Sequence, residues 1–152
     1  MGGASTPSPP NGTDSIRLAI GSRLELLAVV HAVIGGLCKT YEWDETVETA
    51  VLIAVIEAGT NAIQHGNCFA ADKSVEFWFH VSGEEIVVEV DDFGSGFDPG
   101  KVGDPTDASS LLNPHGRGLH LMRELMDEVS FDVREDHGTR VRLRKSFVSA
   151  AR

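Results

Sequence analysis

A pattern of alternating apolar and polar residues between positions 74 and 90 constrains the fold of this chain more than any other feature. In the first segment, residues 74–81, four apolar side chains share one face: Val75, Phe77, Phe79 and Val81. Gly83 and Glu84 interrupt the pattern, and residues 86–90 then alternate in the same way. Because successive side chains of a strand point to opposite sides of a sheet, the pattern predicts an antiparallel hairpin with one apolar face.

Further strands and helices are predicted on both sides of the hairpin. Apolar residues at helical spacing predict three helices, over residues 23–39, 46–64 and 116–126. A short strand is expected over 15–20. Two more strands follow the third helix, one with Val129, Phe131 and Val133 and one around Val141 and Leu143. A turn at residues 136–138 joins these last two strands.

Residues at the ends of the first two helices match known capping patterns. Ser22 and Glu25 have the spacing of a capping box, in which each side chain bonds a free backbone N–H of the first turn. Asp44 is expected to cap the second helix, whose first turn holds acids that suit the positive end of the helix dipole. Gly66 is expected just after this helix, because glycine readily adopts the left-handed conformation that ends many helices.

The order of the predicted elements determines the expected fold class. The helix over 46–64 is apolar around most of its circumference, so we expect it to be buried between the sheet and another helix. The order is strand, two helices, hairpin, long loop, helix and hairpin. Two hairpins predict a mostly antiparallel sheet with the helices on one face. The expected fold class is therefore α+β, a two-layer α/β sandwich.

Composition and charge limit the classes of partner. The chain has 152 residues, with 13 Lys and Arg against 23 Asp and Glu, which gives a formal net charge of −10. This charge repels nucleic acids and anionic membranes, so we expect neither as a direct partner. Residues 1–14 are rich in Gly, Pro, Ser and Thr and are expected to form a disordered tail. One domain is expected over 15–145, followed by a C-terminal tail over 146–152.

The sequence also gives an expectation for the cellular compartment. We recognise no signal peptide and no apolar run that approaches the ~20 residues of a membrane span. The most apolar stretch, residues 24–38, includes Glu25 and His31. We therefore expect a cytoplasmic protein. Cys38 and Cys68 match no metal-ligand or disulfide spacing, and both are expected to be buried as small apolar residues.

Three short motifs are candidates for chemistry. The first lies on the second helix, where Glu57, Asn61 and Gln64 project from one side of an otherwise apolar segment. If buried, such polar groups need partners, because an unpaired buried group costs ~1–3 kcal/mol. A solvated stripe or a structural hydrogen bond would explain the same pattern.

The second motif is D-F-G-S-G over residues 92–96, directly after a predicted strand. An acid at a strand end can accept a hydrogen bond from an amino group, and glycines let a ligand approach the backbone. The same residues are also a common turn signal. Residues 91–114 form a long loop with no periodicity, and loops of this length in compact domains are often active-site lids.

The third motif is H-G-R-G-L over residues 115–119, where the long loop ends and a helix begins. Free N–H groups and the helix dipole at such a position favour an anion, phosphate above all. The motif is not a Walker A loop, because it lacks G-K-[ST]. The chain also has no dinucleotide-binding fingerprint, because no G-x-G-x-x-G follows the first predicted strand.

Taken together and in this order, the motifs closely resemble those of the Bergerat-fold ATPases, the superfamily of DNA gyrase, MutL and the histidine kinases. The narrower likeness is to the anti-sigma-factor serine kinases of bacterial partner-switching systems. It rests on E-A-G-T-N-A-I-Q-H-G over 57–66 and G-R-G-L-H-L-M over 116–122. Gly138 and Thr139, which lead into the last strand, complete the pattern. The resemblance covers residues 15–145 and implies a Bergerat-type sandwich.

The resemblance implies a role for individual residues. Asn61 matches the family's magnesium ligand, Glu57 the general base that acts on the attacking hydroxyl, and Asp92 the acceptor of the adenine amino group. The remaining matches are the adenine-side glycines Gly94 and Gly96, the phosphate-side residues Gly116, Arg117, Gly118 and Leu119, and Thr139 as a support of the adenine pocket. His65 and His115 fit structural or phosphate-rim positions, and neither has a partner at a metal-ligand spacing.

The function that the resemblance implies is an anti-sigma factor that is also a serine/threonine protein kinase. Its cofactors would be ATP and Mg²⁺. Its partners would be a sigma factor, a STAS-domain antagonist as phosphorylation substrate, and a second copy of the chain in a homodimer. Two alternatives stay open: a nucleotide-dependent binding module without kinase activity, and a related switch kinase that binds no sigma factor. Arg140, Arg142 and Arg144 share one strand face, which faces either an acidic partner or solvent.

Overall fold

Five antiparallel strands form one sheet in the part of the chain that the computed structural model describes, which is residues 12–94, 114–134 and 138–147, with backbone alone for 114–116. The strands are β1 (Asp14–Gly21), β2 (Ser74–Val81), β3 (Glu85–Asp91), β4 (Glu128–Val133) and β5 (Thr139–Ser146). Their order across the sheet is β1-β2-β3-β5-β4, and each neighbouring pair is antiparallel.

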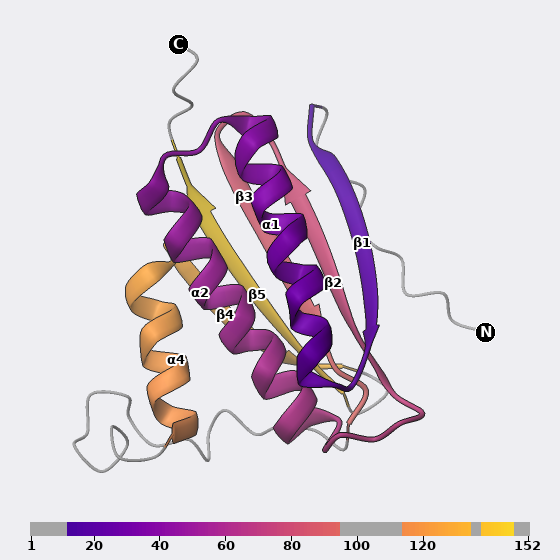
Figure 1. Cartoon of the computed structure of the whole chain (residues 1–152). Coiled ribbons are helices and arrows are strands. Elements are labelled where there is room, and N and C mark those ends of the chain that lie inside the picture. The colour runs from indigo at the N-terminus through magenta and orange to yellow at the C-terminus, as the bar shows by residue number, and fades with distance from the viewer. Residues whose placement is uncertain (1–11, 95–113, 135–137, 148–152) are drawn as a thin grey trace.

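The helices cover one face of this sheet (Figure 1). They are η1 (Leu24–Leu26), α1 (Leu27–Tyr41), α2 (Glu45–Asn61), η2 (Ala62–Gly66) and α4 (Pro114–Leu125). In Figure 1, α2 lies between α1 and α4 and runs antiparallel to α4, so the start of α4 lies beside the C-terminal part of α2. This architecture confirms the predicted α+β class, with helices on one side of an antiparallel sheet.

The hydrophobic core lies between the two layers. On β2 the four apolar residues of the predicted face, Val75, Phe77, Phe79 and Val81, are all completely buried. Val51, Val55 and Ile63 from the α2–η2 helix meet them with no exposed surface of their own. The alternation that predicts the hairpin therefore also identifies the centre of the core. The core extends to Phe147, whose ring contacts Trp43.

The start of the first helix differs from the prediction. The chain enters through the 3₁₀ turn η1, whose N-cap is Arg23 and which has no side-chain capping bond. Ser22 and Glu25 therefore form no capping box. The Ser22 hydroxyl instead donates to the carbonyl oxygen of Lys73 at 2.7 Å, which ties the end of β1 to the start of β2. The Ser22 side chain, which the local pattern assigned to a helix cap, instead bonds a residue 51 positions away in sequence.

The second helix begins as predicted and ends differently. Asp44 is its N-cap, and the Asp44 carboxylate accepts a hydrogen bond from the N–H of Val47 at 2.8 Å. After Asn61 the helix widens into the π-helical turn η2, so Gly66 is the last helical residue and Asn67 is the C-cap. Such wide turns occur mostly as single insertions and often lie at functional sites.

Two helical segments are long and apolar enough, by length and composition alone, to cross a membrane: Leu24–Tyr41 and Glu45–Gly66. The expectation that no segment reaches this length is therefore wrong. Both segments contribute to the core against the sheet, through residues such as Val30 and Ile34 in the first and Val51 and Val55 in the second. Core packing explains the apolar character of the buried residues, which make up 28% of the first segment and 50% of the 18-residue apolar window in the second.

The two cysteines have different environments. Cys38 is buried, as predicted, whereas Cys68 is exposed. Cys68 and Phe69 both have positive φ angles, of 49° and 58°, in the turn that follows η2. This turn brings the chain back toward β2 on the surface, so the expectation that Cys68 is buried is wrong.

The three alternating arginines of β5 lie on the sheet face opposite the helices, because the intervening Val141 and Leu143 are buried in the core. Each forms an ion pair with an acid of a neighbouring strand: Arg140 with Asp91, Arg142 with Glu128, and Arg144 with Glu85. The Arg140–Asp91 pair is bidentate, with both N···O distances at 2.7 Å. These pairs link β5 to both of its neighbours.

Candidate functional site

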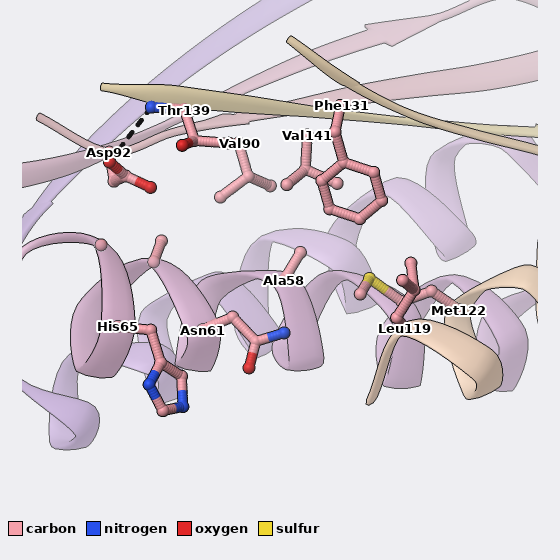
Figure 2. Close-up of a pocket in the computed structure, with 12 residues that line it drawn as sticks. Ala58, Asn61, His65, Val90, Asp92, Leu119, Met122, Phe131, Thr139 and Val141 are labelled. Atoms are coloured by element: carbon pink, nitrogen blue, oxygen red, sulfur yellow. Dashed lines mark hydrogen bonds between the residues drawn. The ribbon is translucent and has the colours of Figure 1, made fainter. Parts of the chain in front are cut away.

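A cavity lies between the sheet and the C-terminal part of the α2–η2 helix (Figure 2). Its empty volume is about 440 Å³ when the open solvent at its mouth is counted. Four lining residues carry polar side chains: Asn61, His65, Asp92 and Thr139. The others are Ala58, Ala62, Gly66, Val90, Leu119, Met122, Phe131 and Val141. A mostly apolar cavity with a few convergent polar groups is typical of a ligand site.

The Asp92 carboxylate lies on the sheet side of this cavity and is only 5% exposed. Its Oδ1 atom accepts two backbone hydrogen bonds, from Gly94 N–H at 3.0 Å and from Thr139 N–H at 3.2 Å. The Asp92 N–H in turn donates to the Thr139 carbonyl at 3.0 Å. Within the described residues, no hydrogen bond is formed by Oδ2. The carboxylate is thus fixed by one oxygen while the other remains available on the cavity side.

Close backbone contacts surround the carboxylate. The Cα of Gly66 lies so near that a Cβ at this position would overlap the Asp92 carboxyl group. A Cβ at Gly94 would overlap the carbonyl oxygen of Gly66. Only glycine permits these approaches, so the end of η2 and the segment after β3 are in direct contact at the cavity.

The electrostatic state of Asp92 reflects two opposing effects. Burial raises the pKa of this carboxyl group, because desolvation disfavours the charged form. The backbone hydrogen bonds from Gly94 and Thr139 and the charge of Arg134 act in the other direction. The pKa lies above its ordinary value, so desolvation is the larger effect.

A second group of polar residues lies on the helix side. Glu57 and Asn61 are one turn apart on α2, and both are half-buried. Gly118 of α4 faces them: a Cβ on Gly118 would lie 2.9 Å from Glu57 Oε2 and 3.5 Å from Asn61 Nδ2. Gly118 lies in the second turn of α4, so the N-terminal half of this helix lies beside the pair. In Figure 2 the Asn61 and His65 side chains point away from the sheet, whereas the Asp92 carboxylate points from the sheet toward the helices.

Most of the predicted site residues meet around the cavity. Asn61, His65, Asp92, Leu119 and Thr139 line it. Glu57, Gly94 and Gly118 do not line it but contact or adjoin residues that do. Arg117 is exposed near the start of α4. Gly96, the side chain of His115 and most of the long loop lie outside the described residues, and Gly116 is described only as backbone of α4. Gln64 is half-buried and lies outside the lining.

Two kinds of residue at or beside the cavity are not among those predicted from the sequence. The apolar walls Val90, Met122, Phe131 and Val141 have the spacing of ordinary core residues, so no local signal distinguishes them. Asn67 is 2% exposed and accepts a hydrogen bond from the N–H of Phe93, next to Asp92, at 2.8 Å. Its position directly after the E-x-x-x-N helix was the only available hint.

The raised pKa of Asp92 predicts a specific pH dependence of stability. The folded state holds the Asp92 proton more tightly than the unfolded chain, so this group makes stability fall as pH rises through the interval between the unfolded and folded pKa values. Asp92→Asn removes the titration. We therefore expect the free energy of unfolding of the wild type, relative to Asp92→Asn, to increase when the pH is lowered from 7 toward the ordinary aspartate range (~4). Urea denaturation of both proteins at several pH values measures it, and a pH-independent difference would contradict the assignment.

Comparison with known proteins agrees with this architecture. The sequence profile of the histidine kinase-like ATPase domain matches residues 20–145. The serine-protein kinase RsbW of Bacillus subtilis is 32% identical over 127 residues, which are 78% of this chain and 78% of that protein. An anti-sigma F factor of Clostridium botulinum is 34% identical over 99 residues, covering 64% of this chain and 69% of that protein.

A solved structure shows the same fold. The chain aligns with the crystal structure of the RsbU and RsbW domains of Rv1364c from Mycobacterium tuberculosis with a TM-score of 0.64 and 16% sequence identity. The alignment covers 90% of this chain and about a third of that longer chain (34%). From the profile match and the identity to these relatives, the chain belongs to the histidine kinase-like ATPase domain family, in the group that contains the RsbW serine-protein kinases and the anti-sigma F factors.

Proposed function

We propose that this chain is an ATP-dependent serine/threonine protein kinase that also acts as an anti-sigma factor. Membership in the family implies ATP binding. The observation that carries the proposal is the arrangement of the cavity: a fixed carboxylate with one available oxygen lies on the sheet side, and a carboxylate–amide pair lies beside a helix N-terminus on the other side. The first feature suits a base with an amino group, and the second suits a phosphate chain and its metal.

The sheet side of the cavity fits adenine. Oδ2 of Asp92 would accept a hydrogen bond from the exocyclic amino group, and the flat ring would lie among the apolar walls formed by Val90, Met122 and Val141. Gly66 lies directly against the carboxylate, and any side chain at this position would overlap it. Thr139, whose backbone bonds Asp92 twice, would hold this arrangement in place.

The helix side fits the phosphates and a magnesium ion. Mg²⁺ prefers oxygen ligands and is commonly held by one or two protein groups together with phosphates and water. The amide oxygen of Asn61 supplies one such ligand, and the described residues contain no group of three or more His, Cys, Asp or Glu that could hold a metal alone. The N-terminus of α4, with Arg117 and Gly118, would bind phosphate through backbone N–H groups and the helix dipole. His65 would lie at the rim.

Glu57 is the proposed general base. When bound, ATP supplies the phosphoryl group that is transferred to a serine or threonine hydroxyl. Glu57 lies one turn before Asn61 on the same side of α2, so its carboxylate would orient this hydroxyl and accept its proton. Positioning and charge stabilisation supply most of the acceleration in such transfers, which is why few catalytic side chains are needed.

Asn61→Ala tests the metal-binding part of the proposal. Loss of one oxygen ligand is expected to weaken ATP binding in the presence of Mg²⁺ about 10–100-fold and to leave the weaker metal-free binding nearly unchanged. Calorimetric titration with ATP, with and without Mg²⁺, measures both. Gln64→Ala is the matched control, because Gln64 is a half-buried amide on the same helix that does not line the cavity. A folded wild type that binds no ATP would overturn the nucleotide site altogether.

Glu57→Gln tests the catalytic part. The amide keeps the size of the side chain and cannot accept the proton, so we expect phosphotransfer to fall by about 10²–10⁴-fold while ATP affinity changes only a few-fold. The assay follows transfer from radiolabelled ATP to a STAS-domain antagonist protein. Transfer by the variant at the wild-type rate would remove Glu57 from the mechanism. ATP binding without transfer by the wild type would favour a non-catalytic binding module.

The partners are proposed from the relatives, which are named as a serine-protein kinase and an anti-sigma factor. We include in the proposal a homodimer in a bacterial cytoplasm that holds a sigma factor and phosphorylates a STAS-type antagonist on serine or threonine. The net charge of −10 is compatible with a basic surface on the sigma factor.

Sigma-factor binding is tested separately from kinase activity. The chain, mixed with the sigma factors of its source organism in the presence of Mg-ATP, is expected to co-purify with one of them. The unphosphorylated antagonist should release that sigma factor. An active kinase that captures no sigma factor would instead be a switch kinase with a different output.

A further inference from the structure

The peptide group between Asp92 and Phe93 is hydrogen-bonded on both sides. Its carbonyl oxygen, from Asp92, accepts from Arg134 Nη1 at 3.2 Å, and its N–H, from Phe93, donates to Asn67 Oδ1 at 2.8 Å. The Arg134 guanidinium also lies over the Phe93 ring, 4.4 Å from its centroid. A planar peptide group bonded on both edges cannot rotate without losing both bonds.

Asn67 is held firmly enough to act as the fixed partner. Its Nδ2 atom donates to the Ser74 carbonyl and to the Ser22 hydroxyl, both at 2.9 Å. The Ser22 hydroxyl is committed as a donor to the Lys73 carbonyl, so it accepts from Asn67. Because Phe93 N–H is only a donor and the Ser74 carbonyl only an acceptor, the amide has one possible orientation. Asn67 therefore connects the start of β2 with the segment after β3.

The orientation of this peptide controls one of the two hydrogen bonds that hold the Asp92 carboxylate, the bond from Gly94 N–H, while Thr139 N–H supplies the other. Gly94 N–H, which bonds Asp92 Oδ1, follows Phe93 directly in the chain, so rotating the Asp92–Phe93 peptide would move that donor away. Gly94 is also in contact with the Gly66 carbonyl, which leaves it little room to compensate. The connection therefore runs from Asn67 through Phe93 N–H and Gly94 N–H to Asp92.

We propose that Asn67 is a positioning residue that fixes the Asp92–Phe93 peptide and thereby sets the preference of the site for 6-amino purine nucleotides. With Oδ1 held by backbone donors, Oδ2 presents an acceptor to the ligand. A 6-amino purine offers a donor there, and a purine that lacks the amino group leaves the buried oxygen unpaired. If the peptide is free to rotate, Oδ1 keeps only the bond from Thr139, and this discrimination is weakened while the apolar walls still bind the ring. The inference rests on the proposed binding of ATP.

The test compares two ligands and three proteins. Calorimetric titrations at one Mg²⁺ concentration give the Kd of ATP and of purine riboside triphosphate, which lacks the 6-amino group. The wild type is expected to prefer ATP at least about 10-fold. In Asn67→Ala this ratio is expected to fall at least about threefold, mostly through weaker ATP binding. In Ser22→Ala the ratio should stay near the wild-type value, because Ser74 still holds the amide and the bond to Phe93 is intact.

The outcomes separate this inference from the proposed function. A wild type that does not bind ATP removes the proposed function and the inference with it. A wild type that prefers ATP, together with a folded Asn67→Ala that keeps the full preference, overturns the inference alone. If Asn67→Ala does not fold, Arg134→Ala releases the carbonyl side of the same peptide. That variant should lower the ratio at least about threefold, and an unchanged ratio would again overturn the inference. A global structural defect would weaken both ligands equally and leave the ratio intact.

Discussion

The hydrogen bonds of the buried Asp92 carboxylate are the interaction on which the geometry of the site depends. They join the end of β3 to the start of β5, because Asp92 and Thr139 exchange backbone and side-chain bonds. On the other side the carboxylate lies against the Cα of Gly66, so the end of the central helix is placed by the same group. Two strand ends and one helix end are therefore fixed relative to one another by one acidic side chain. Displacing any of them by the width of a methyl group would break a bond or create an overlap.

The helix α2 connects this point to the rest of the molecule. Its inner side carries small and β-branched residues, Ala54, Val55 and Ala58 among them, which are buried against the sheet. Glu57 and Asn61, one turn apart, face Gly118 of α4. The helix then continues as the wider π-helical turn η2. At its end Gly66 contacts the Asp92 carboxyl group, and Asn67 accepts a hydrogen bond from Phe93 N–H. One continuous segment thus provides the core, the polar pair and the support of the carboxylate.

Local patterns in the sequence were sufficient for the layers of the fold, and the motifs of the family resemblance included five residues that line the cavity: Asn61, His65, Asp92, Leu119 and Thr139. The alternation in β2 and β3 and the cap at Asp44 are local, and they were predicted correctly because neighbouring residues determine them. Ser22 was assigned wrongly because its partners, Lys73 and Asn67, are 51 and 45 residues away. The bond from Phe93 to Asn67 spans 26 residues. Such contacts depend on the tertiary arrangement of distant segments, and no periodicity in a single sequence encodes them.

The buried carboxylate also relates the stability of the protein to its selectivity. Burial raises the pKa of Asp92, so the charged form is less stable in the folded protein despite two backbone hydrogen bonds. A ligand that donates a hydrogen bond to Oδ2 would stabilise that charged form and lower the pKa again. A ligand without a donor would desolvate the carboxylate further without supplying a hydrogen bond. The hydrogen bonds that hold Asp92 therefore leave its charged form destabilised in the free protein, whereas in a complex with a hydrogen-bond donor that charged form would be favoured. These bonds maintain a carboxylate that the free protein stabilises incompletely, so under the proposed function a ligand with a donor would be bound more tightly than one without.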